Sequence, residues 1–292
     1  MSENSNSQSL IATVVAVAVG ALVAWAGSDG GDTWRGWPVY ALCAALAFAI
    51  NWVVFVPSAL AKSERFYDLT GGITYLSVTL LAVSLSEALD LRGQLVAGAV
   101  IIWALRLASF LFRRIMRDGK DGRFDEMKVN PVIFLMAWTL QGLWVLLTAA
   151  AALAVITGGT REPLGALGIV GIGVWLAGFA IEVVADGQKS RFKADPANRG
   201  KFISHGLWAW SRHPNYFGEI VIWTGMALIA LPVLQGWQYV TLISPVFVYF
   251  LLTKVSGVPL LEQRSDEKWG GQEDYERYKA NTPVLMLKPP SR

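Results

Sequence analysis

The sequence has little of what a disulfide-rich domain or a soluble metalloenzyme needs. It contains one cysteine, Cys43, in 292 residues, which excludes an intramolecular disulfide framework. Its two histidines, His205 and His213, are too few for a His/Cys site, so we predict no metal centre. Charged residues make up only 16%, against about 25% in soluble domains. A formal net charge of +3 is also too small to predict nucleic acid as a partner.

The motifs of soluble nucleotide-binding and hydrolytic enzymes are absent as well. There is no Walker loop, H-E-x-x-H or G-x-S-x-G sequence. The run from Gly168 to Gly173 resembles a dinucleotide fingerprint, but its third glycine would fall on Leu176. We interpret these small residues as a site of close helix packing.

Long apolar runs are abundant. Apolar residues make up 54% of the chain, and its 13 tryptophans suit a protein that crosses two membrane–water interfaces. Eight runs approach the length of about 20 residues that spans a bilayer: 10–27, 38–57, 69–86, 94–112, 131–157, 164–185, 216–232 and 238–253. The sequence therefore predicts an all-α polytopic bundle of seven or eight transmembrane helices, with residues 1–292 as a single membrane domain.

The charge of the connecting segments alternates. Segments 58–68, 113–130, 186–215 and 254–292 carry 21 of the 25 Lys and Arg residues. Segments 28–37, 87–93, 158–163 and 233–237 carry three, and Arg106 lies within a span. The positive-inside rule places the first set and both termini in the cytoplasm. Polar chemistry is therefore expected to face the cytosol.

The most informative stretch runs from Ser211 to Glu219. Pro214 favours the start of a helix and keeps the residue before it out of the helical region. A helix that begins at a membrane edge presents free N–H groups to anions. Glu219 leads into an apolar run, where a carboxylate is a functional hypothesis by default, although it could instead pair structurally with an arginine. The candidate residues here are Arg212, His213, Asn215, Tyr216 and Glu219.

A second stretch covers Glu182 to Lys193. If the sixth span continues as a helix, Glu182, Asp186, Lys189 and Lys193 share one stripe. Such a stripe is often only a solvated face, but beside the helix start at Pro214 its lysines could clamp a phosphate.

Two further groups of residues are candidates. Tyr67 and Asp68 begin the third span, where they could act on a substrate carbonyl, or Asp68 could neutralise Arg106. The tail 262–278 is amphipathic and could lie on the membrane or cap the loops. Arg106, Arg123 and Asp266 complete the predicted cofactor-binding set.

These residues resemble a known family. Gly206-Leu-Trp and Arg212-His-Pro-Asn-Tyr-Phe-Gly-Glu219 resemble the C-terminal signature of steroid 5-alpha-reductases and their bacterial relatives, and of the related sterol C14/C7 reductases. Gln188-Lys-Ser-Arg-Phe-Lys193 is similar to the basic element of the sterol reductases. The resemblance is specific over about 185–283, and residues 1–130 supply spans with substrate-polarising candidates.

The resemblance implies a membrane reductase that binds NADPH without a Rossmann fold and reduces a conjugated enone, typically a 3-oxo-Δ4 steroid. It implies cofactor contacts for Asn215, Glu219, Lys193 and Asp186. It places Tyr67 and Asp68 near the family's carbonyl-gripping position, whereas Trp103 stands where the family has a tyrosine. We therefore expect Asp68 and Tyr67 to be catalytic and the substrate to be an apolar small molecule from the lipid, with no obligate protein partner.

Two alternatives have different chemistry. One is an S-adenosylmethionine-dependent methyltransferase of the isoprenylcysteine carboxyl type, which shares an R-H-P-x-Y-x-G core. The other is a non-catalytic sterol- or lipid-binding membrane protein, which the departure at Trp103 favours.

Overall fold

The computed structural model describes residues 3–87, 89–118 and 122–290, and of these it leaves out the side chains of residues 3, 4, 114, 117, 118 and 123. The chain divides into two compact units. Unit 1 comprises Met1–Gly168 and Ile229–Ser244, and unit 2 comprises Ile169–Leu228 and Pro245–Arg292.

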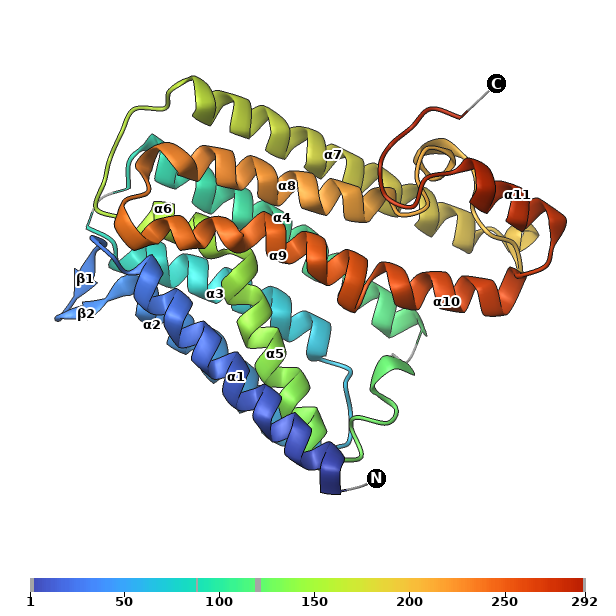
Figure 1. Ribbon diagram of the computed structural model, residues 1–292, viewed down its shortest axis with the longest axis horizontal. Coiled ribbons are helices and arrows are strands. Elements are labelled where there is room, and N and C mark those ends of the chain that lie inside the picture. The colour runs from blue at the N-terminus through green and yellow to red at the C-terminus, as the bar shows by residue number, and fades with distance from the viewer. Residues whose placement is uncertain (1–2, 88, 119–121, 291–292) are drawn as a thin grey trace. The chain divides into compact units, whose positions relative to one another are not determined.

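The elements are almost all helical (Figure 1). Up to residue 168 they are α1 (Glu3–Gly27), β1 (Thr33–Trp34), β2 (Trp37–Pro38), α2 (Val39–Leu60), α3 (Tyr67–Leu85), α4 (Leu91–Asp118), the 3₁₀ turn Gly122–Phe124, α5 (Pro131–Thr148) and α6 (Ala150–Thr157). After them come α7 (Ala166–Ala194), 3₁₀ turns at Pro196–Asn198 and Gly206–Ala209, α8 (Pro214–Ala230), 3₁₀ turns at Leu231–Val233 and Gly236–Leu242, α9 (Ile243–Phe250), the π-helical Leu251–Val255, α10 (Val258–Trp269) and α11 (Glu273–Asn281).

The predicted all-α membrane bundle is confirmed. In the described part of the chain, eight helices are long and apolar enough to cross a membrane: Ser5–Gly27, Val39–Leu60, Tyr67–Leu85, Leu91–Arg113, Pro131–Thr148, Ala166–Ala194, Pro214–Val233 and Gly236–Trp269. The strands β1 and β2 form one short hairpin that turns through Arg35 and Gly36, both with positive φ. The protein is thus built as a multi-pass membrane protein.

One predicted span differs in detail, because run 131–157 forms two helices. The start of α5 is fixed by Asn130, whose side chain accepts the Val132 N–H at 3.0 Å, and by Pro131 in the first turn. The two helices meet at Ala149, whose N–H donates to the Val145 carbonyl of α5 and whose carbonyl accepts from the Leu153 N–H of α6. Every residue of α6 is buried, so this short helix lies in the core of unit 1.

In unit 1, α5 packs against α1 and α2, and α3 packs against α2 and α4 (Figure 1). The four segments poor in Lys and Arg gather at one end of this unit. Gly159 donates to the Gly30 carbonyl at 3.2 Å, Trp237 N–H donates to Asp29 at 2.8 Å, and Glu87 N–H donates to Asp32 at 3.2 Å. Two of the Lys/Arg-rich segments are joined by the Lys128–Glu64 ion pair at 2.9 Å. The alternation of loop charge read from the sequence therefore matches how these loops associate.

In unit 2, α7 and α8 touch backbone to backbone. A Cβ added at Gly178 would lie 2.6 Å from the Ile222 nitrogen, and one at Gly225 would lie 2.5 Å from the Trp175 nitrogen. Gly171 takes part in the same contact, since its carbonyl oxygen lies 2.7 Å from a Cβ built at Gly225. The close approach of the two helices therefore depends on Gly178 and Gly225, whereas a Cβ added at Gly173 of the predicted run would meet nothing within 4 Å.

Candidate functional site

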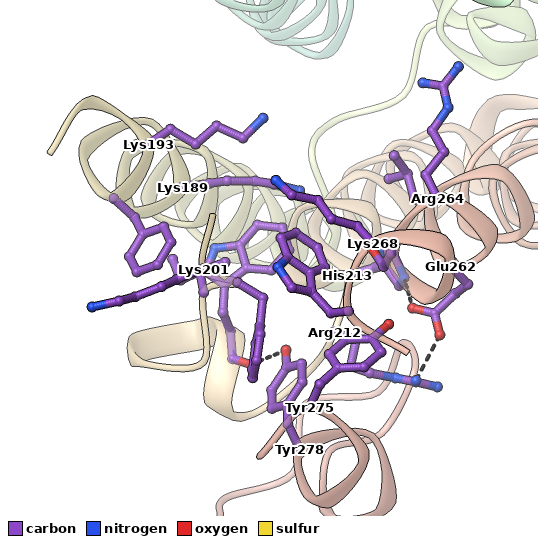
Figure 2. A pocket seen from close by; sticks show the side chains of 17 residues that line it. Lys189, Lys193, Lys201, Arg212, His213, Glu262, Arg264, Lys268, Tyr275 and Tyr278 are labelled. Atoms are coloured by element: carbon purple, nitrogen blue, oxygen red, sulfur yellow. Dashed lines mark hydrogen bonds and ion pairs between the residues drawn. The ribbon is translucent and has the colours of Figure 1, made fainter. Parts of the chain in front are cut away.

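Unit 2 contains a pocket of about 330 Å³, formed by the end of α7, the loop that follows it, and helices α10 and α11 (Figure 2). Seventeen residues line it. Six of them are cationic, namely Lys189, Lys193, Lys201, Arg212, Arg264 and Lys268. Among the described residues that line the pocket, Glu262 is the only carboxylate. The pocket therefore carries a strong positive charge.

Aromatic rings form much of the remaining wall. Phe202 lies at the centre, with ring centroids 5.9 Å from Trp269, 5.2 Å from Tyr275 and 5.3 Å from Tyr278. Charged nitrogens and aromatic faces together suit a ligand that combines phosphate groups with a planar ring system.

The start of α8 brings two of the predicted residues into the pocket. Pro214 is the first residue of the helix, as the sequence predicted. The preceding His213 donates its backbone N–H to the Ser211 hydroxyl at 3.1 Å. This turn holds the side chains of Arg212 and His213 at the pocket wall.

Glu262 on α10 joins those two side chains. One carboxylate oxygen lies 2.7 Å from an Arg212 guanidinium nitrogen, and the other lies 2.8 Å from His213 Nε2 (Figure 2). Burial lowers the pKa of His213, and the bond to Glu262 opposes that shift only in part. His213 is therefore neutral at pH 7 and donates from Nε2 to the carboxylate, which leaves one negative charge to orient Arg212.

The end of α7 supplies the predicted lysines. The helix runs through to Ala194, as the stripe from Glu182 to Lys193 required. Lys189 Nζ lies 4.3 Å from the centre of the Trp208 ring, and Trp208 Nε1 donates to the Ala185 carbonyl at 3.0 Å. Gln188 accepts the Leu207 N–H at 2.9 Å. These contacts hold the loop 201–213 against the end of α7, so that cations from both line one pocket.

Helix α11 closes the pocket through hydroxyl groups. Tyr278 donates to the Trp208 carbonyl at 2.7 Å, and Tyr275 donates to Asp266 at 2.9 Å. Asp266 also pairs with Lys279 at 2.7 Å. Burial is the main cause of the raised pKa of both tyrosines, so they are protonated and able to donate.

The structure brings together some of the predicted site residues. Lys189, Lys193, Arg212 and His213 line the pocket. Asp186, Asn215, Tyr216, Glu219 and Asp266 belong to the same unit but are not among the lining residues. Tyr216 stacks on His213 with ring centroids 5.7 Å apart, and Asp186 is buried on α7.

The remaining candidates belong to unit 1. Tyr67 donates to the Ala137 carbonyl at 2.9 Å and packs on Phe124 and Trp138. Asp68 and Arg106 lie on α3 and α4, and the side chain of Arg123 lies outside the described residues. Trp103 is buried, with its ring edge-on to Tyr75 at 5.0 Å.

Sequence reasoning did not select Lys201, Glu262, Arg264 or Lys268 as site residues. In the sequence these residues are indistinguishable from the charges that orient loops at a membrane, because nothing in their spacing marks the loop and the tail as neighbours. Within the described residues, no three His, Cys, Asp or Glu side chains are grouped as a metal site.

Comparisons with known proteins support a family assignment. An uncharacterized protein of Schizosaccharomyces pombe is 25% identical over 208 residues, which cover 61% of this chain and 59% of the yeast protein. The chain thus spans less than two thirds of that relative's length. No solved structure matches the chain. The DUF1295 profile, described as a protein of unknown function, matches residues 54–282. Since this match covers more than half of the sequence, the chain belongs to the DUF1295 family.

Proposed function

We propose that the protein is an NADPH-dependent membrane reductase that reduces the C=C bond of a conjugated enone, with 3-oxo-Δ4 steroids as the first substrates to test. Its family includes steroid 5-alpha-reductase-like membrane proteins, which supports this choice. The observation that carries the proposal is the pocket, in which six cationic side chains face one carboxylate.

The charge of the pocket fits NADPH. A phosphomonoester carries up to about two negative charges at pH 7, and the diphosphate adds more. Charge-assisted hydrogen bonds to such groups contribute about 1.5–3 kcal/mol each, less where the side chain is exposed. Arg212 can hold phosphate oxygens bidentately, whereas the lysines act as mobile point charges around it. The aromatic wall around Phe202 offers faces for a nucleobase.

The proposed reaction assigns roles to the cofactor and to Asp68 and Tyr67. NADPH, when bound, supplies a hydride for the β-carbon of the enone. We propose that the Tyr67 hydroxyl, which donates to the Ala137 carbonyl in the structure, turns to donate to the carbonyl oxygen of the enone, where negative charge grows as the hydride arrives, and that Asp68 orients the phenol or the carbonyl group. A proton is then added at the α-carbon, which completes the reduction. An apolar bundle interior shields this reaction from water and suits a substrate that enters from the lipid.

The location of the pocket fits the proposed orientation. The loop 201–213 and the tail lie in segments rich in Lys and Arg, which the positive-inside rule assigns to the cytoplasm. We therefore propose that the cofactor site faces the cytosol. In a bacterium, this is the cytosolic side of the inner membrane.

The methyltransferase alternative fits the pocket less well. S-adenosylmethionine carries a sulfonium cation, which a pocket with six cationic side chains repels. The non-catalytic alternative predicts sterol binding without nucleotide binding.

Thermal-shift titrations with NADPH, NADH and S-adenosylmethionine test the proposal on purified protein. We expect stabilisation by NADPH, less by NADH, and none by S-adenosylmethionine. NADPH-dependent loss of enone absorbance with testosterone-type steroids then tests turnover. Stabilisation by S-adenosylmethionine but not by NADPH would refute the proposal, and nucleotide binding without any enone reduction would refute its reaction.

A further inference from the structure

The segment that follows the family match lies along the loop that carries Arg212. The DUF1295 match ends at residue 282. Beyond it, half-buried and exposed residues alternate from Pro283 to Lys288. The segment bends at residues 284–286, so it forms no regular strand and is held to the protein by individual hydrogen bonds.

Backbone hydrogen bonds hold this segment, residues 283–288, to the loop. Arg212 donates its N–H to the Pro283 carbonyl at 2.9 Å, and Lys288 donates its N–H to the Trp210 carbonyl at 3.0 Å. As the loop advances from Trp210 to Arg212, its partners go back from Lys288 to Pro283, so the two segments run in opposite directions. Side-chain identity plays little part in these backbone bonds, which explains why no pattern in the sequence predicts them.

Ser211 connects this segment to α8. Its side chain is fully buried, and its hydroxyl donates to the Leu285 carbonyl at 2.8 Å. The same oxygen accepts the His213 N–H at the helix start. The peptide on each side of Arg212 is therefore held, since the Arg212 N–H is bonded to Pro283 and the His213 N–H to Ser211.

The Arg212 side chain is held from the opposite direction. Its guanidinium pairs with Glu262 at 2.7 Å and is only 13% exposed. A flexible arginine loses much side-chain freedom when it binds a phosphate, and this loss is smaller when the side chain and its backbone are already ordered.

We propose that residues 283–288 are a positioning element that fixes the Arg212 backbone, so that its guanidinium is preorganised for an anionic ligand. The inference rests on the proposed anion-binding function of the pocket. It adds to that function a requirement for a segment that does not line the pocket.

The test compares two truncations of the full chain. One ends after Thr282 and removes the positioning element, and the matched control ends after Lys288 and keeps every bond described above. Affinity for NADPH and for inorganic pyrophosphate is measured by titration. We expect the first truncation to weaken both by about tenfold, equivalent to one good hydrogen bond, and the control to bind as the intact protein does.

A double-mutant cycle separates positioning from general loss of structure. Each truncation is combined with Arg212→Gln and, separately, with Lys193→Gln. If the segment acts through Arg212, the loss from truncation disappears in the Arg212→Gln background and persists in the Lys193→Gln background. A loss of equal size in both backgrounds overturns the proposal, because it then reflects a damaged pocket.

The outcomes distinguish this inference from the proposed function. Binding by the intact protein with no effect of truncation overturns the positioning role alone. Binding of pyrophosphate without NADPH overturns the cofactor assignment and leaves the positioning role to be decided by the cycle. Binding of neither ligand overturns both. If the shorter chain does not fold, Ser211→Ala in the full chain replaces it, and the same dependence on Arg212 is required.

Discussion

Replacing Arg212 with glutamine is the sharpest test of the pocket. The Arg212 side chain is 13% exposed and lies against Glu262 at 2.7 Å, so its bond to a phosphate is poorly screened by salt. A charge-assisted hydrogen bond is worth about 1.5–3 kcal/mol. Since 1.4 kcal/mol corresponds to a factor of ten, Arg212→Gln should weaken NADPH binding about 10- to 150-fold.

A matched control exists on the same unit. Arg277 lies on α11, its side chain is 68% exposed, and it pairs with Glu273 outside the pocket. Arg277→Gln removes the same charge and should change NADPH affinity by less than about twofold, since exposed charges contribute little.

The assay is a titration of NADPH at several salt concentrations, with the unfolding temperature of each variant measured in parallel. Arg212→Gln should bind NADPH more weakly at every salt concentration, because the contact that it loses is poorly screened. Glu262 keeps its His213 partner, so a large fall in stability is not expected. Equal affinity for Arg212→Gln and Arg277→Gln would refute the assignment of this pocket as the anion site.

Three further predictions concern packing, pH and the reacting end. Gly178→Ala should destabilise the protein by about 1–3 kcal/mol in thermal unfolding, because the added Cβ meets the α8 backbone. The control Gly173→Ala should be neutral or stabilising, since a Cβ there meets no atom within 4 Å. Equal effects of the two substitutions would contradict the contact between α7 and α8. Burial lowers the pKa of His213 in the folded state, so the contribution of neutral His213 to stability should be complete above a pH of about 6.5 and should decrease as the pH falls below that value. His213→Gln should reduce the decrease in unfolding temperature at low pH. An unchanged curve of unfolding temperature against pH would contradict the lowered pKa. Tyr67→Phe and Asp68→Asn should keep NADPH affinity but lose about 10²–10³ in single-turnover enone reduction, and normal turnover by folded variants would show that the proton donor lies elsewhere.

Much of the fold could be predicted because it depends on local sequence. The eight spans follow from apolar length, since a backbone in lipid must satisfy its hydrogen bonds within each helix. The start of α8 follows from Pro214, whose ring fixes φ and removes an N–H that a first turn does not need. The run of α7 to Ala194 was required for Glu182 and Lys193 to share a stripe.

Part of the site could be predicted for the same reason. Lys189, Lys193 and Arg212 were identified from their positions at a helix end and a helix start, and all three line the pocket. The break at Ala149 was not predicted, because no glycine or proline marks it in the sequence.

The tertiary structure alone decided which distant segments meet. Glu262 lies 49 residues from His213, yet it joins His213 and Arg212, and no periodicity links α10 to the start of α8. Lys201, Arg264 and Lys268 are ordinary loop or tail charges in the sequence and become pocket residues only when the tail folds back on the loop. Backbone bonds such as that from Arg212 to Pro283 involve groups that every residue carries, so the sequence does not encode them in any recognisable pattern. Local propensity thus determines the helices, whereas the pocket arises from long-range pairing of polar groups.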